Sequence, residues 1–241
     1  MMQSINIVVG AGSIGQAVAD KLACENTTYL VSRSARDASE NGRVINKQLD
    51  TTCADEITSF LNELKANGNV IQYLISTIGV LHQSEGNVTL QPEKKLEDLN
   101  TASLLAYFET NTIVPMLWVK GAVDMMKQEH SAVVCLSARV GSISDNRLGG
   151  WYGYRASKAA LNMMMKTAAV EYARRAKQTS LVCYHPGTVD SNLSKPFQRN
   201  VKEGKLFSPD YTATQLVSLL STLEPQQSPY FVDWDHKPVS W

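Results

Sequence analysis

The stretch INIVVGAGSIG, residues 5–15, decides the fold. Its first five residues are rich in β-branched side chains and predict a short strand, and the glycines that follow predict a tight turn into a helix. Gly10 permits the turn, Gly12 leaves room for a phosphate beside the backbone, and Gly15 lets the helix pack closely on the strand. Because a helix N-terminus attracts anions, this unit predicts a dinucleotide site. The predicted cofactor contacts on it are Gly10, Gly12, Ser13, Ile14 and Gly15.

Short apolar runs alternate with helical segments along the rest of the chain. Such alternation builds a parallel sheet that is covered by helices on both faces. The expected fold is therefore α/β: a three-layer, doubly wound Rossmann fold with a seven-stranded parallel sheet in a single domain. Its ligand belongs at the carboxyl ends of the strands. Beyond residues 5–9, strands are expected at residues 28–32, 43–48, 70–76, 132–137, 180–184 and 230–232.

Composition narrows the class of partner. With 241 residues, 44% of them hydrophobic, the chain can bury a full core. Lys+Arg and Asp+Glu both total 23, so no net charge attracts nucleic acid or an acidic membrane, and neither is expected as a partner. The four cysteines are widely spaced and form no C-x-x-C pair, which predicts free thiols in a reducing cytosol and no metal site. No apolar run reaches about 18 residues, so a soluble, cytoplasmic protein is expected.

The end of the second strand bears on the choice of cofactor. An NAD-selective site usually has a carboxylate here for the ribose 2′-hydroxyl, whereas this chain has Ser32 followed by Arg33. An arginine suits a 2′-phosphate, so NADP(H) is favoured over NAD(H); the alternative is that Arg33 and Arg36 are solvated loop charges. After the third strand, Asp50 is placed either to contact the adenine amino group or to cap the helix that runs to about Ala66.

A long helix is expected at residues 102–130, with an interruption near Pro115. Proline lacks a backbone donor and clashes with the carbonyl four residues earlier, which belongs to Asn111. The disturbed carbonyl of Asn111 is placed to hold a water molecule. The alternative is an asparagine that faces solvent.

The stretch GWYGYRASKAAL, residues 150–161, predicts the start of another helix. Tyr154 and Lys158 lie four residues apart and therefore share one face. A free phenol titrates near pH ~10, so proton exchange at neutral pH needs a pKa lowered by roughly 3 units, which a nearby ammonium and a cationic cofactor can supply. Tyr154 is thus a candidate general acid or base, and the alternative is that both side chains lie on the helix surface.

The sixth strand leads into His185 and a Pro186-Gly187 turn, where His185 is expected to be structural rather than catalytic. Residues 191–207 are polar and rich in lysine, without clear periodicity. Such a segment is typical of a mobile lid over a substrate site. Because it is the least patterned part of the chain, the sequence does not identify the substrate.

Along essentially its whole length the chain resembles the short-chain dehydrogenase/reductase family. Residues 139–146 and 149–158 resemble the C-factor-like and sniffer-like carbonyl reductases in particular. The family features are Gly10, Gly12, Gly15, Asp50, Asn111, the region of Ser137, Tyr154, Lys158, Pro186 and Gly187.

The resemblance implies hydride transfer between a nicotinamide ring and a small carbonyl substrate. It implies that Tyr154 gives its proton to the carbonyl oxygen, and that Lys158 lowers the phenol pKa and binds the nicotinamide ribose. Asn111 would hold a water molecule in a proton relay. Further cofactor contacts are implied at Gly79, Pro186 and Gly187, with Thr188 and Val189 supporting the carboxamide end.

The chain departs from the family at three places. Only Ala11 separates the first two glycines of the turn, and Ser76-Thr77-Ile78-Gly79 replaces the usual Asn-Asn-Ala-Gly. The position that normally carries the catalytic serine is Ala138. Ser137 can replace the missing hydroxyl only if the strand end is kinked, because adjacent strand residues point to opposite faces, and Ser142 can do so only if its loop folds back.

Two functions follow from these features. The first is an NADPH-dependent reductase that acts on a small carbonyl compound. The second is a C-factor-like signalling or regulatory protein that keeps the nucleotide site but has little turnover. For either, the resemblance implies a homodimer or homotetramer that pairs through the helices carrying Asn111 and Tyr154.

Overall fold

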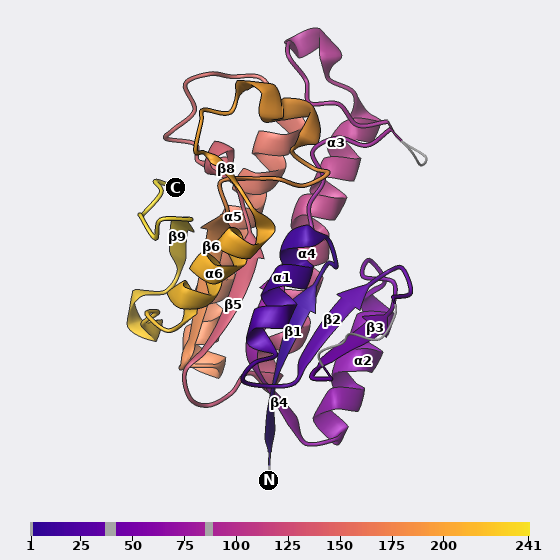
Figure 1. The fold of residues 1–241 in the computed structure, drawn as a ribbon, viewed down its shortest axis with the longest axis vertical. Helices are drawn as coiled ribbons and strands as arrows, with labels where there is room; N and C mark the ends of the chain where they lie inside the picture. Colours follow the sequence, from indigo (N-terminus) through magenta and orange to yellow (C-terminus); the bar gives the residue numbers. More distant parts are fainter. Residues whose placement is uncertain (1, 37–41, 85–88) are drawn as a thin grey trace.

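A computed structural model describes residues 2–36, 42–84 and 89–241, and its centre is one sheet of seven parallel strands (Figure 1). The strand order is β3-β2-β1-β4-β5-β6-β9, so the direction of winding reverses between β1 and β4. This confirms the predicted doubly wound α/β fold, in which ligands bind at such a reversal. The strands are β1 (Gln3–Val9), β2 (Thr28–Ser32), β3 (Val44–Gln48), β4 (Asn69–Ser76), β5 (Ser131–Leu136), β6 (Thr179–His185) and β9 (Tyr230–Asp233).

Helices cover both faces of the sheet. Helices α1 (Ser13–Leu22) and α6 (Pro209–Leu220) lie on the near face in Figure 1, and α2 (Ala54–Ala66), α4 (Val114–Ala122) and α5 (Tyr152–Arg175) pack on the other. Successive strand residues therefore enter different cores: Ile7, Leu74 and Val133 face α2, α4 and α5, whereas Val8, Ile75 and Val134 face α1 and α6. No helix within the described ranges is long and apolar enough to cross a membrane.

The expected long helix is divided. Helix α3 (Thr101–Phe108) passes through a π-helical turn, Glu109–Ile113, into α4, which confirms the distortion predicted before Pro115. The helical region ends at Met125 rather than near residue 130. It stops early because the backbone continues beside β4, where the Lys127 amide donates to the Ile71 carbonyl at 2.8 Å.

The segment predicted to be an unpatterned lid is folded. A short strand just before it, β7 (Thr188–Val189), pairs in parallel with a short strand at its end, β8 (Leu206–Phe207), and a 3₁₀ helix, Lys195–Asn200, lies between them. Figure 1 shows β8 beyond the carboxyl ends of the sheet strands. The sequence missed this pairing because two-residue strands carry no periodicity.

Close packing explains two of the three glycines in the turn after β1. Gly10 has a φ of +100°, and a Cβ on Gly15 would lie 1.8 Å from the Gly10 carbonyl oxygen. Thr77 at the end of β4 donates to that same oxygen at 2.8 Å. Gly12 differs, because nothing lies within 4 Å of the place where its Cβ would be. The space beside Gly12 is therefore open to a ligand.

This contrast predicts different effects of alanine at the two positions. Gly15→Ala should lower the free energy of unfolding by about 3 kcal/mol, because the new methyl group meets fixed backbone. Gly12→Ala should change it by less than about 1 kcal/mol, since its φ of −70° suits alanine and the space is open. Urea denaturation measures both. Equal losses for the two variants would contradict the packing described for Gly15.

Candidate active site

Two cavities open at the carboxyl edge of the sheet, at the point where the winding reverses. The larger, about 910 Å³, follows the glycine turn and the ends of β2 and β3. The smaller, about 300 Å³, lies between the end of β5, the first turns of α5 and the segment after β6. Both are lined by Thr77, Ile78 and Gly79 at the end of β4. The two cavities therefore lie side by side along this wall, and together they make up the crevice at the strand ends.

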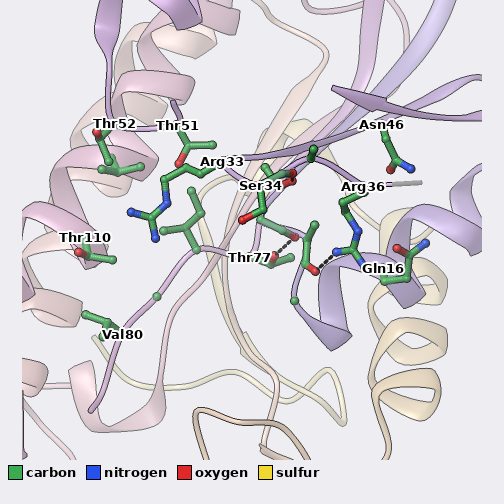
Figure 2. Close-up of a pocket in the computed structure, with 18 of the residues that line it drawn as sticks. Gln16, Arg33, Ser34, Arg36, Asn46, Thr51, Thr52, Thr77, Val80 and Thr110 are labelled. Atoms are coloured by element: carbon green, nitrogen blue, oxygen red, sulfur yellow. Dashed lines mark hydrogen bonds between the residues drawn. The ribbon is translucent and has the colours of Figure 1, made fainter. Parts of the chain in front are cut away.

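Arginines and small polar groups line the larger cavity (Figure 2). Gly10, Gly12 and Ser32 are part of its wall, as predicted, and Arg33 and Arg36 leave the loop after β2 in different directions. Arg36 donates a hydrogen bond to the Ala11 carbonyl inside the glycine turn. No carboxylate side chain lies among the described residues of this wall. The wall therefore has the charge expected for a ligand that carries phosphate groups.

Asp50 lies outside this wall. Its Oδ1 accepts hydrogen bonds from the Thr52 amide at 2.9 Å and the Thr52 hydroxyl at 2.7 Å, and these bonds lower the pKa of the carboxyl group. The alternative that Asp50 caps α2 is wrong, because Cys53 is the residue at the N-cap. Thr51 and Thr52 line the cavity instead.

The other predicted cofactor contacts, three in the glycine turn and one after β4, lie in different surroundings. Ser13 is exposed as the first residue of α1, and Gly15 is buried in packing. Neither of them lines a cavity. Ile14 lines the smaller cavity, and Gly79 lines both.

Asn111 is buried in the π-helical turn, so the alternative of a solvent-facing side chain is wrong. Its Oδ1 accepts from the Val80 amide at 2.7 Å, and its Nδ2 donates to the Val80 carbonyl at 3.0 Å and to the Ser157 hydroxyl at 3.1 Å. The side chain therefore ties the loop after β4 to helix α5. A water held by its backbone carbonyl stays a prediction.

Lys158 is only 3% exposed and enters the crevice from α5. Its Nζ donates to the Leu136 carbonyl at the end of β5, at 2.8 Å. A Cβ on Gly79 would lie 3.4 Å from this Nζ, so the chain passes close to the ammonium. Burial lowers the pKa of Lys158 to about 8, and the neighbouring Cys135 and Cys183 oppose the shift. Lys158 is therefore still mainly charged at neutral pH.

Tyr154 is also buried, so the alternative that the pair lies on the helix surface is wrong. The rings of Trp151 and Tyr107 flank it edge to face, with centroids 6.2 and 6.4 Å away. The Lys158 Nζ lies 6.0 Å from the centre of the phenol ring. Burial raises the pKa of Tyr154, which is opposite to the predicted lowering. The protein alone therefore favours the neutral phenol, the form that can donate a proton.

Neither serine considered as a substitute for the missing hydroxyl is hydrogen-bonded to this phenol. Ser137 donates to Asn162 Oδ1 at 2.6 Å, and the Ser142 hydroxyl accepts from the Asp145 amide at 3.1 Å. Ala138 has extended backbone, so the strand end is not kinked, and its side chain packs in the same cluster as Tyr154. Among the described residues, no side-chain hydroxyl is hydrogen-bonded to the Tyr154 phenol. The methyl group of Ala138, rather than a serine hydroxyl, thus packs in the cluster that contains Tyr154.

Pro186, Gly187, Thr188 and Val189 line the smaller cavity together with His185. Gly187 has a φ of +75°, and a Cβ there would lie 2.6 Å from the Phe207 ring. Burial lowers the pKa of His185 to about 4, and its ring packs against Trp234 with centroids 5.3 Å apart. His185 is therefore neutral at neutral pH.

Several wall residues of the smaller cavity were not identified from the sequence. Trp151 contacts Phe197 of the 3₁₀ helix edge to face, with ring centroids 5.2 Å apart. The two rings come from segments that meet only in the folded chain, so no local pattern could pair them. The apolar wall residues that were not predicted individually are Leu81, Val140 and Trp151, together with Leu193, Phe197 and Val201 of the segment 191–207, which was predicted as a whole to lie over a substrate site.

Comparisons with known proteins agree with this geometry. A model of the short chain dehydrogenase family matches residues 4–202. A benzil reductase ((S)-benzoin forming) of Bacillus cereus is 25% identical in an alignment that covers 92% of this chain and 96% of the relative. The C-signal protein of Myxococcus xanthus is 28% identical over 147 residues, covering 61% of this chain and 83% of that protein.

Among solved structures, the NADPH-bound carbonyl reductase from chicken fatty liver superposes with a TM-score of 0.80 at 20% identity. The match covers 100% of this chain and 94% of that one. At this identity the likeness shows a shared fold.

The lowered pKa of Lys158 predicts a pH-dependent stability. In the unfolded chain the ammonium keeps its ordinary pKa of 10.5, so between about pH 8 and pH 10.5 the unfolded state binds more protons than the folded state. The penalty for burying the charge is fully present below this window and disappears as the pH rises through it. Between about pH 7.5 and pH 9.5, the free energy of unfolding of the wild type should rise by about 2 kcal/mol relative to that of Lys158→Met.

Urea denaturation of both proteins at the two pH values measures this difference. Loss of the bond to Leu136 shifts the variant by a constant amount and leaves the slope unaffected. Parallel pH profiles for the two proteins would show that Lys158 keeps its ordinary pKa in the folded state.

Proposed function

The chain belongs to the short chain dehydrogenase family, and on this premise we propose that it is an NADPH-dependent reductase that acts on a small carbonyl compound. The observation that carries the proposal is the place of Tyr154 and Lys158. Both are buried on one helix beside a cavity that shares the wall residues Thr77, Ile78 and Gly79 with the arginine-lined cavity. A proton donor thus lies where a substrate can meet the nicotinamide end of a dinucleotide.

The residues of the larger cavity fit NADP(H). Gly12 leaves open space at the N-terminus of α1 for the pyrophosphate, and Arg33 and Arg36 offer guanidinium groups to a 2′-phosphate. Thr51 and Thr52 lie on the same wall for the adenosine end. The family resemblance also suggests that Asp50 contacts the adenine and that Ser13 contributes at the helix N-terminus. The missing carboxylate after β2 supports a preference for NADP(H) over NAD(H).

In the smaller cavity, Pro186, Gly187, Thr188 and Val189 are placed to support the carboxamide end of the nicotinamide. When bound, the cofactor supplies the hydride that reduces the carbonyl carbon. Tyr154 gives its phenol proton to the carbonyl oxygen. The charged Lys158, held by Leu136, stabilises the phenolate that this transfer leaves and binds the nicotinamide ribose. Asn111 keeps the loop after β4 against α5 and takes part in the relay that returns the proton.

Ala138 limits the rate that we expect of this site. A second donor beside Tyr154 would stabilise the charge that develops on the carbonyl oxygen, and loss of one such donor costs on the order of 10²–10³ in rate in other enzymes. Ser137 is fixed on Asn162, so in this conformation Tyr154 acts without it. A slow reductase is the consequence.

A nucleotide-binding signalling or regulatory protein is the second candidate. The methyl group of Ala138 and the similarity to a C-signal protein favour it. For either function, exposed apolar side chains on α5, namely Met163, Met164 and Val170, support self-association through that helix. The segment at residues 191–207, which brings Phe197 over Trp151, is proposed to close over the substrate.

Removing the phenol hydroxyl tests the reductase. Tyr154→Phe should abolish NADPH consumption with a panel of aldehydes, ketones and quinones, while the Kd for NADPH changes by less than about threefold, because the hydroxyl serves proton transfer. An absorbance assay measures turnover, and calorimetry measures the Kd. Unchanged turnover in Tyr154→Phe would remove Tyr154 from the mechanism, and a wild-type protein that binds NADPH without consuming it would favour the regulatory candidate.

Adding a hydroxyl tests the role of Ala138. Because Ala138 packs beside Tyr154, Ala138→Ser should raise kcat on the order of 10²-fold by giving the carbonyl oxygen a second donor. Ser137→Ala is the matched control and should leave kcat within about threefold of the wild type, since its hydroxyl binds Asn162. The assignment fails if Ser137→Ala loses turnover while Ala138→Ser gains none.

A further inference from the structure

A buried carboxylate lies at the N-terminus of α5, outside both cavities. Glu93 belongs to the loop between β4 and α3 and is 2% exposed. Its Oε2 accepts a hydrogen bond from the Gly153 amide at 3.1 Å, and its backbone carbonyl accepts one from the Trp151 amide at 2.5 Å. One residue therefore holds the chain on both sides of Tyr152.

Helix α5 has no cap from its own sequence. Trp151, at the N-cap, has a left-handed backbone with a φ of 54°, and its side chain accepts no capping bond. The first turn contains no acidic residue. The first amides of a helix need acceptors, and negative charge is favoured beside them. Glu93 supplies both from a position 60 residues earlier in the chain.

Glycine at position 153 leaves room for this carboxylate, whose Oε1 is buried without a hydrogen-bond partner among the described residues. A Cβ on Gly153 would lie 2.8 Å from Glu93 Oε1 and 2.5 Å from the Tyr107 ring, so glycine is required for the approach. Arg155 fixes the preceding residues from the other side: its Nε donates to the Gly150 carbonyl at 2.9 Å, and its Nη2 donates to the Gly149 carbonyl at 3.2 Å.

These contacts matter for the candidate active site because Trp151 and Tyr154 lie at the start of α5. Trp151 forms the aromatic wall of the smaller cavity, and Tyr154 follows three residues later. Gly149, Gly150 and Trp151 all have positive φ values, and such a segment persists only where its surroundings fix it. Without an acceptor at Gly153, the turn that presents the phenol is free to fray.

We propose that Glu93 is a positioning residue that caps α5 from a distant loop and thereby fixes Trp151 and the Tyr154 phenol for the reaction. The effect of Glu93 on catalysis rests on the reductase proposed above. Its capping of α5 is independent of that proposal. The essential property of the Glu93 side chain is that it is long enough to accept from the Gly153 amide; its charge alone is not sufficient.

Two variants separate reach from charge. Glu93→Gln keeps the length of the side chain and an oxygen acceptor, whereas Glu93→Asp keeps the charge but is one methylene too short. Glu97→Gln, on an exposed carboxylate of the same segment, is the control. Because a displacement of about 1 Å costs about 10²-fold in rate, Glu93→Asp should lower kcat by about 10²-fold with the Kd for NADPH within about threefold of the wild type, and Glu93→Gln should stay within about threefold in kcat.

Amide hydrogen exchange supplies a readout that does not depend on turnover. Glu93→Asp should speed exchange at residues 151–155 relative to the sheet strands, and Glu93→Gln and Glu97→Gln should not. Full activity and unchanged exchange in Glu93→Asp would overturn the proposal, as would an inactive Glu93→Gln beside an active Glu93→Asp. A wild type that binds NADPH without turnover would favour the regulatory candidate over the reductase, and exchange at residues 151–155 would still decide whether Glu93 caps α5.

Discussion

The hydrogen bond from the buried Lys158 ammonium to the Leu136 carbonyl joins α5 to the edge of the sheet, and the site depends on it. Burying an ammonium is costly, as its lowered pKa of about 8 shows. The chain nevertheless approaches it closely at Gly79, where a Cβ would lie 3.4 Å from the Nζ. Tyr154 lies one turn away on the same helix, so the bond sets how far the phenol stands from the strand ends.

The sheet provides a rigid edge, and loops from several parts of the chain complete the site. Asn111 binds the backbone of Val80 and the side chain of Ser157, and so holds the loop after β4 against α5. The segment after β6 brings Phe197 onto Trp151. The crevice therefore combines strand ends, which form its floor, with an apolar wall that is assembled from distant loops.

The sequence predicted the parts of this account that depend on local pattern. Strand 28–32, the glycine turn and the distortion before Pro115 have signals within a few residues, and the structure confirms all three. Contacts between distant segments have no such signal. Neither the bond from Glu93 to Gly153 nor the pairing of β7 with β8 could be read from spacing.

The sequence also could not predict the orientation of the serines or the pKa of Tyr154, because neither is set by a local pattern. The hydroxyl of Ser137 is bound to Asn162 of α5, and the pKa of Tyr154 is raised by burial in the folded chain.

Calorimetric titration of the wild-type protein with NADPH and with NADH tests whether the crevice at the reversal of the sheet holds a phosphorylated dinucleotide. NADPH should bind, and NADH should bind more weakly. Binding of neither would contradict this assignment of the crevice.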